Sequence, residues 1–374
     1  MNLIDTNILK ALKVNFFLKF LIFLIPIWVI PFNSQLIYIG LITSIIIAIY
    51  LFFFGDINFN KLINNYSFQS VFVLLLVISA LFILAESLSN FKATAIYLIR
   101  LYLPSTLIFL FLFSKNIKDN AQTYLSIFIC SLFVLSTIEF INSVYFTINK
   151  VNFNFTEVYY NIKRVSLFSS DSNWWAIILF PIFLILIENL KKNFDTINSF
   201  LVFSFLFFII MTFSKATIFI IFLYIFVEII SYVIKTSDKN IFKILVAISF
   251  FSFVLFYSYL YPNNSTRFLI VRECMNFYSD ATLSGIVLGL GVDGFPKKYW
   301  HNAHVLCGAF IEYGLFFVII FIIFIMNIIN TNTIKFIFWL IILFNFSLFP
   351  VAQFFVVLLP LILYNHILNN EQSS

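Results

Sequence analysis

The residues of this chain that could do chemistry are concentrated between Arg267 and Gly314. This stretch holds two of the four arginines, two of the three histidines and six of the eight glycines. Guanidinium groups bind anions such as phosphate, histidine rings transfer protons near neutral pH, and glycines let the backbone turn sharply or approach a ligand. The combination favours a site that holds an anion and moves a proton.

Two histidines, His301 and His304, come just before an apolar run, and Glu312 follows His304 by eight residues. In a helix this spacing places His304 and Glu312 on roughly the same face, about two turns apart. A histidine at the mouth of a membrane cavity can take up a proton near neutral pH, so His304 is a candidate acid or base, with Glu312 and His301 beside it. An interfacial histidine without a catalytic part is the alternative. The pair lacks a third ligand at a convincing spacing, so no metal site is expected. No other cofactor is expected either.

The arginines are the candidates for binding an anion. Arg267 and Arg272 lie five residues apart, and a solvated amphipathic helix is the alternative interpretation for them. Arg100 stands among apolar residues, where an arginine is unfavourable unless it faces a cavity, a partner or an anion. Snorkelling to the interface, or pairing with Glu139, explains Arg100 equally well. His366, near the carboxyl end, is not expected to take part.

A second group of polar residues precedes an apolar run that begins near residue 173. Lys163 and Arg164 are adjacent cations, which fit either a phosphate-binding loop or an ordinary solvated loop. Asp171 is a plausible helix cap whose charge suits the positive end of the helix dipole. Further on, Gly289, Gly291 and Gly294 have the spacing of a dinucleotide fingerprint. Because that motif needs a βαβ unit around it, we reject this interpretation and expect the glycines to serve sharp turns.

The elements that must position these residues are membrane helices. The chain has 374 residues, of which 62% are hydrophobic and 10% charged, and its mean hydropathy of +1.05 lies outside the range of soluble domains. The apolar runs are continuous, as in helices that cross a bilayer. We predict an all-α polytopic membrane protein with one integral membrane domain, residues 1–374, and no nucleic-acid partner.

Apolar runs bounded by charged or turn residues predict about twelve spans, although tight junctions at Pro350 and at Ser214 leave ten or eleven open. Their expected bounds are 15–32, 36–55, 68–86, 93–113, 122–147, 173–190, 197–213, 216–234, 241–260, 303–329, 334–349 and 351–367.

The distribution of lysines predicts the orientation. If both termini are cytoplasmic, the inner side receives twelve lysines, and the short outer connections receive only Lys92 and Lys215. This asymmetry satisfies the positive-inside rule, while the inverted orientation is the alternative. Two long loops, about 148–172 and 261–302, then lie outside, together with every arginine. An anionic ligand handled at the outer face is therefore favoured. The twelve inner lysines are Lys10, Lys13, Lys19, Lys61, Lys115, Lys118, Lys191, Lys192, Lys235, Lys239, Lys243 and Lys335.

These segments resemble the O-antigen polymerase (Wzy-type) and O-antigen ligase superfamily. The outer loop and following helix of that family are similar to Gly289–Phe295 with His301, Asn302, His304 and Glu312–Gly314. Arg164 followed by Asp171–Asn173 resembles an earlier loop motif. Thr212, Ser214 and Lys215 resemble a Thr-x-Ser-Arg turn with lysine in place of arginine. The expected glycine after Arg164 is missing, and either His301 or His304 can hold the family position.

The resemblance implies a GT-C-like glycosyltransferase of the bacterial inner membrane whose active site faces the periplasm. Its substrates would be undecaprenyl-diphosphate-linked glycans, with no metal or nucleotide sugar. Arg164, Arg267, Arg272, Arg100 and Lys215 would bind the diphosphate, and His304, Glu312 and His301 would be catalytic. The chain would polymerise O-antigen or a related surface polysaccharide, together with a chain-length regulator protein. A ligase that transfers glycan to lipid A core is the first alternative, and a flippase or other transporter is the second.

Overall fold

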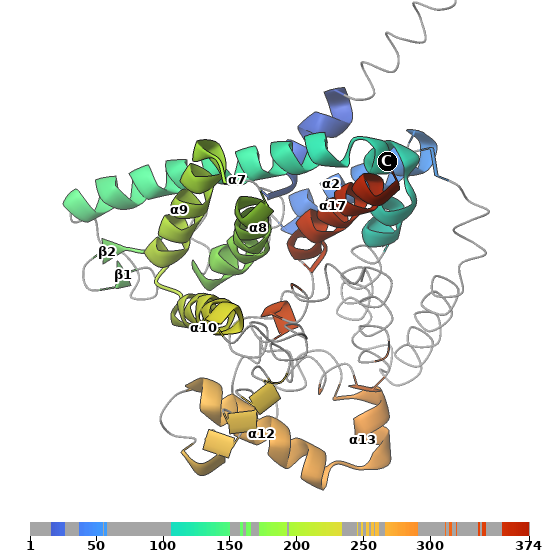
Figure 1. Ribbon diagram of the computed structural model, residues 1–374. Helices are drawn as coiled ribbons and strands as arrows, with labels where there is room; N and C mark the ends of the chain where they lie inside the picture. Colours follow the sequence, from blue (N-terminus) through green and yellow to red (C-terminus); the bar gives the residue numbers. More distant parts are fainter. Residues whose placement is uncertain are drawn as a thin grey trace, which may run out of the picture. The chain divides into compact units, whose positions relative to one another are not determined.

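The structure is a computed structural model that describes residues 16–26, 37–54, 56–57, 106–149, 158–159, 162–165, 172–192, 194–233, 261, 266–290 and 354–373, with single positions between 245 and 260 and between 311 and 341. The described part is almost entirely helical, as predicted (Figure 1). It also contains a short antiparallel hairpin of strands β1 (Val158–Tyr159) and β2 (Ile162–Lys163) within the first predicted long loop.

The chain forms two compact units whose segments alternate along the sequence. The first contains Met1–Asn65, Leu103–Ser214 and Ala352–Ser374, and the second contains Tyr66–Tyr102 and Lys215–Val351. The first unit is built mainly from α2 (Ile37–Phe54), α6 (Lys115–Asp119), α7 (Ala121–Ile148), α8 (Ser172–Lys192), α9 (Thr196–Met211) and α17 (Phe354–Ser373). α8 packs against α9 and α17, and α7 packs against α17 and α9 (Figure 1).

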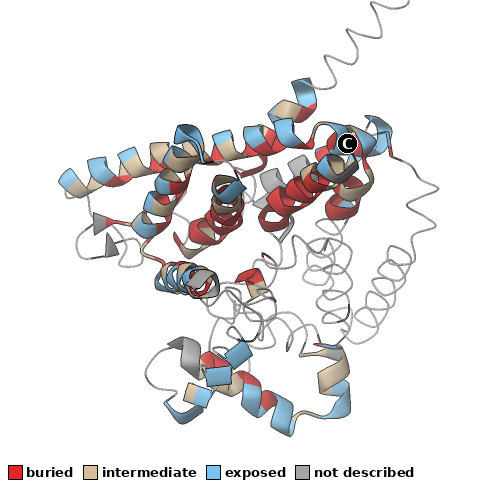
Figure 2. Cartoon of the chain, in the orientation of Figure 1, coloured by how far each residue is buried: buried red, intermediate tan, exposed pale blue. Residues whose placement is uncertain are grey.

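α8 forms the core of the first unit. Almost every side chain from Trp175 to Leu186 is buried, and Figure 2 shows this burial continuing into α17. A helix that is apolar on all sides is stable only where other helices or lipid cover it. The indole Nε1 of Trp175 donates a hydrogen bond of 3.1 Å to Ser136 Oγ on α7. This bond joins α7 to α8 through two buried side chains.

α7 turns a polar stripe toward the interior of the first unit. The hydroxyl of Ser131 donates to the carbonyl oxygen of Phe23 at 2.5 Å. Ser143, three turns further along, donates to the carbonyl oxygen of Lys163 in β2. α7 therefore connects the amino-terminal helix to the hairpin. The buried polar residues of α7 are Ser131, Ser136, Glu139 and Ser143.

α17 closes the first unit from the carboxyl end of the chain. His366 is buried, and its Nε2 lies 3.1 Å from the carbonyl oxygen of Phe111. Asn370 Nδ2 donates to the carbonyl oxygen of Lys118 at 3.0 Å, which places the end of α17 beside α6. His366 thus has a structural contact that sequence analysis did not predict.

The second unit includes α10 (Lys215–Val233), α12 (Thr266–Asp280) and α13 (Leu283–Leu288). Ile270, Cys274 and Phe277 on one face of α12 pack against Ile311. The N–H of Leu290 donates to the carbonyl oxygen of Ile311 at 2.9 Å. Arg267 and Arg272 therefore lie on a helix, one face of which packs within the second unit.

Several predicted spans coincide with helices that the structure describes. α7 and α8 are the helices of the described part that are long and apolar enough to cross a membrane, judged by length and composition. The predicted bounds 122–147, 173–190, 197–213 and 216–234 each differ by at most two residues from those of α7, α8, α9 and α10. The last helix continues to Ser373, beyond the predicted end at 367. The total of about twelve spans stays a prediction.

Candidate functional site

The turn that follows α9 contains a strained residue. Thr212 caps the helix, and its N–H bonds to the carbonyl oxygens of Phe208 and Ile209 at 3.2 and 3.1 Å. Phe213 then adopts a φ of 50°, in the left-handed region where glycine is the usual residue. A bulky side chain there costs about 1–2 kcal/mol. Such strain persists only where neighbouring groups hold it, and it is concentrated at functional sites.

Arg164 holds this turn in place. Its Nε donates to the carbonyl oxygen of Thr212 at 2.9 Å, and its Nη2 donates to that of Phe213 at 3.3 Å. The backbone N–H of Val165 donates to the carbonyl oxygen of Met211 at 2.9 Å. These bonds satisfy carbonyls that a helix end leaves without partners, and the positive guanidinium suits the negative end of the helix dipole. The loop arginine and the Thr-x-Ser turn therefore form one site.

Lys163 anchors the hairpin to the end of α7. Its N–H donates to Thr147 Oγ1 at 3.1 Å, and its carbonyl oxygen accepts from Ser143. Its ammonium lies 4.7 Å from the centroid of the Phe146 ring, a cation–π contact, and the residue is buried. The interpretation of Lys163 and Arg164 as an ordinary solvated loop is therefore wrong, because both side chains make contacts within the fold.

An unpaired hydroxyl lies at the same end of the first unit. Ser172 begins α8 and is 3% exposed, and its Oγ has no hydrogen-bond partner in the described part of the chain. Because α8 and α9 are joined by a short connection and pack together, the start of α8 lies near the end of α9, which precedes Thr212. A buried hydroxyl without a partner is unfavourable by about 1–3 kcal/mol. The site can offer this hydroxyl to a polar group of a ligand.

Arg272 and Arg267 belong to α12 in the second unit. Arg272 Nη2 lies 3.5 Å from Glu273 Oε1, and its buried Nε has no hydrogen-bond partner within the described residues. The two arginine positions are about 140° apart around the helix axis, since each residue of an α-helix turns by about 100°. They therefore occupy different sides of α12.

The turn residues of the second unit follow the sequence prediction. Gly289 ends α13 with a φ of 77°, so it serves a sharp turn, whereas Gly291 and Gly294 lie outside the described residues. Lys215 is the exposed first residue of α10, directly after Ser214 in the sequence.

The predicted catalytic residues His304, Glu312 and His301 lie outside the described residues, as does Arg100. Their roles stay predictions. Within the described residues, no group of three or more histidine, cysteine or acidic side chains could hold a metal ion.

Sequence reasoning underestimated two residues of the first unit. Glu139 was considered only as a partner for Arg100, yet it is 2% exposed on the polar stripe of α7. For Ser172 the sequence indicates only membership of the loop motif Asp171–Asn173. The spacing of Ser136, Glu139 and Ser143 at three and four residues, within a span, was the signal for a buried polar face.

Comparisons with known protein families, with curated proteins and with solved structures give no match to this chain. The site must therefore be interpreted from its own geometry. The site contains an arginine held by two hydrogen bonds, a strained turn, and a buried hydroxyl without a partner among the described residues, all at one end of the first unit.

Proposed function

We propose that this chain is a membrane-embedded glycosyltransferase that polymerises undecaprenyl-diphosphate-linked oligosaccharides of O-antigen or a related surface polysaccharide. The supporting observation is the bonding of Arg164 to Thr212 and Phe213. The sequence had singled out the arginine loop and the Thr-x-Ser turn separately, on the family resemblance. A shared site requires that the arginine loop and the turn lie in contact, and these hydrogen bonds provide that contact.

Outward-facing apolar stripes support placement in a membrane. On α9 the exposed residues Phe200, Phe203 and Phe207 recur at three- and four-residue spacing. α10 repeats the pattern with Phe219, Phe222 and others. Exposed apolar surface of this extent is unfavourable in water and suits contact with lipid tails.

The ends of the first unit support the predicted orientation. α7 has 28 residues, so its ends lie about 40 Å apart. Lys115 and Lys118 precede its first residue, while Lys163 contacts its last turns and Arg164 directly follows Lys163 in the sequence. Lys192 at the end of α8 pairs with Glu371 of α17, on the side of Lys118. A lysine-rich inner end and an arginine site at the outer end fit the positive-inside rule.

The proposed reaction is a group transfer without an external oxidant or cofactor. A hydroxyl oxygen of the acceptor sugar attacks the anomeric carbon of the donor glycan, and the bond between that carbon and the diphosphate oxygen breaks. The hydroxyl proton passes to a base, for which His304 is the candidate, with Glu312 or His301 assisting. Undecaprenyl diphosphate leaves with the bonding electron pair.

The arginines have the role of stabilising the departing diphosphate. Charge develops on its oxygens as the bond breaks, and charge-assisted hydrogen bonds are worth about 1.5–3 kcal/mol each. Arg164 is the candidate in the first unit. Arg267, Arg272, Arg100 and Lys215 are the further candidates. Ser172 can donate to a phosphate or sugar oxygen.

Deletion of the gene and complementation with variants test the proposal. Surface glycan is separated on a gel from strains that carry the wild type, Arg164→Ala, or the control Lys191→Ala. Lys191 is an exposed residue at the opposite end of the first unit. We expect Arg164→Ala to abolish the polymer ladder while the protein stays in the membrane, and Lys191→Ala to leave the ladder unchanged.

The deletion strain separates the alternatives. A single repeat unit attached to core means polymerase. Core with nothing attached, and polymer retained on carrier lipid, means ligase. Repeat units that never reach the periplasm mean a transporter. The last two results overturn the proposal.

A further inference from the structure

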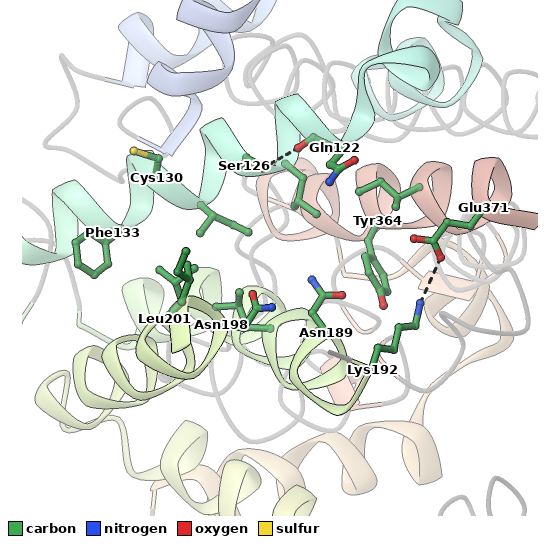
Figure 3. Close-up of a pocket in the computed structure, with 15 residues that line it drawn as sticks. Gln122, Ser126, Cys130, Phe133, Asn189, Lys192, Asn198, Leu201, Tyr364 and Glu371 are labelled. Atoms are coloured by element: carbon green, nitrogen blue, oxygen red, sulfur yellow. Dashed lines mark hydrogen bonds and ion pairs between the residues drawn. The ribbon is translucent and has the colours of Figure 1, made fainter. Parts of the chain in front are cut away.

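A cavity of about 560 Å³ lies between α7, α8, α9 and α17 in the first unit (Figure 3). This volume is in the range of sites that bind small organic molecules, about 300–1,000 Å³. All of its lining residues belong to one unit, so its shape depends on a single set of packed helices. It lies at the lysine-rich end of that unit, remote from Arg164.

The lining changes from polar to apolar along the cavity. Figure 3 shows Lys192 and Glu371 at one end and Phe133 at the other, with Asn189 between them. Gln122 lies on α7 near the polar end. From Gln122 to Phe133 the rise of an α-helix gives about 16 Å. This is close to half of a hydrocarbon core of about 30 Å, the depth of one leaflet.

The polar end carries one charge of each sign. Lys192 Nζ and Glu371 Oε2 lie 3.4 Å apart, with the side chains 49% and 59% exposed. An ion pair so exposed contributes little to stability. Both side chains are long and flexible, so the ion pair can open. Lys192 can then bind the phosphate of a ligand, and Glu371 can bind its ammonium. A ligand with both charges complements this end better than one with a single charge.

We propose that this cavity binds one phospholipid of the adjacent leaflet whose headgroup contains a phosphate and a primary ammonium. Its phosphate bonds to Lys192 and its ammonium to Glu371. One acyl chain lies along the apolar wall toward Phe133 and Leu201. The proposal rests on the membrane insertion argued above, and it does not depend on the glycan chemistry.

The other ligand classes fit the cavity less well. A wholly polar ligand, such as a free nucleotide, would leave the apolar wall around Phe133 and Leu201 in contact with polar groups. A phospholipid with a net negative headgroup satisfies Lys192 but places its charge beside Glu371, which disfavours binding.

Native mass spectrometry of the purified full-length protein tests the proposal. The protein in detergent is mixed with equal amounts of phosphatidylethanolamine and phosphatidylglycerol that have identical acyl chains. We expect about a fivefold preference of the wild type for phosphatidylethanolamine, the size of effect given by a partly exposed charge pair. Glu371→Lys presents two cations and should reverse the preference.

Two further variants make the result specific. Asp280→Lys applies the same charge change at an exposed position of α12, in the second unit and away from the cavity lining, and it should keep the wild-type preference. Ser126→Trp fills the cavity from an exposed position on α7 and should remove both bound lipids. Equal binding of the two lipids by the wild type overturns the proposal. So does an unchanged preference in Glu371→Lys, or retention of lipid in Ser126→Trp. Because no glycan is measured, failure here leaves the polymerase proposal standing.

Discussion

The Nε of Arg164 lies 2.9 Å from the carbonyl oxygen of Thr212, although 48 residues separate the two in the sequence. The same guanidinium reaches the carbonyl oxygen of Phe213, the residue whose backbone is strained. The arginine thus fixes the end of α9 and occupies the proposed phosphate site at once. A substitution of Arg164 should therefore affect both the stability of the turn and the reaction.

The first prediction concerns Arg164→Lys. Lysine keeps the positive charge but lacks the planar fork that reaches two carbonyl oxygens. We expect the unfolding free energy to fall by about 1.5–3 kcal/mol, as for loss of hydrogen bonds to a charged group. Thermal unfolding of the purified variant in detergent measures this change. A variant as stable as the wild type would show that the two bonds contribute nothing.

The second prediction concerns the strain at Phe213. Glycine and asparagine tolerate a positive φ, whereas a β-branched residue does not. We expect Phe213→Asn to be more stable than Phe213→Val by about 1 kcal/mol, even though valine is the more apolar residue. The two variants are compared by thermal unfolding under identical conditions. The opposite order would mean that packing of the side chain outweighs the backbone conformation.

The third prediction concerns the hydrogen bond between Trp175 and Ser136. Ser136→Ala leaves a buried indole N–H without an acceptor, which is unfavourable by about 1–3 kcal/mol. We expect the double variant Trp175→Phe with Ser136→Ala to be more stable than the sum of the single effects predicts. A double-mutant cycle should give a coupling of about 0.6–1.7 kcal/mol, the range for interhelical bonds in membranes. Strict additivity contradicts the bond.

The fourth prediction separates folding from function at His366. Its Nε2 bonds to the carbonyl oxygen of Phe111, far from the proposed reaction. We expect His366→Ala to lower the unfolding free energy by about 1–3 kcal/mol, because it removes a buried contact. The surface glycan ladder, normalised to the amount of protein in the membrane, should not change. A shortened ladder at equal protein level would assign His366 to the reaction.

The fifth prediction concerns orientation. Cysteines introduced singly at Asp195 and at Tyr159 are tested with a thiol reagent that does not cross the membrane, after Cys130, Cys274 and Cys307 have been replaced by serine. We expect labelling from outside at Tyr159, in the hairpin, and none at Asp195, which caps the start of α9. Labelling at Asp195 alone means the inverted orientation.

The helices of the described part were predictable because membrane spans depend on a long-range average of hydropathy, which single substitutions hardly change. The bounds of α7 and α8 therefore agreed with the sequence within two residues. The turn at Phe213 was not predictable, because nothing in a Thr-Phe-Ser tripeptide indicates a left-handed residue. Its conformation depends on Arg164, which is distant in sequence, and only tertiary structure brings the two together.

The two interpretations of Lys163 and Arg164, a phosphate-binding loop and an ordinary solvated loop, show the same limit. Two adjacent cations in a loop suit water, phosphate or an internal contact equally well at the level of sequence. The aromatic ring of Phe146 and the hydroxyls of α7 hold Lys163 in an internal contact. Both belong to a helix that ends before the loop begins. Hydropathy contains no information on such pairings.

The polar stripe of α7 has a consequence for how the protein is made. Thr137 and Thr147 bond to carbonyl oxygens of their own helix at 2.8 and 2.7 Å, so they are satisfied as soon as α7 exists. The partners of Ser136 and Ser143 are Trp175 and Lys163, which the ribosome adds later. We therefore expect α7 to leave the insertion machinery with these hydroxyls turned onto its own backbone. Ser143 exchanges its donated bond once Lys163 has been added, and Ser136 accepts from Trp175 only after α8 has followed, so that maturation of this helix lags behind its insertion.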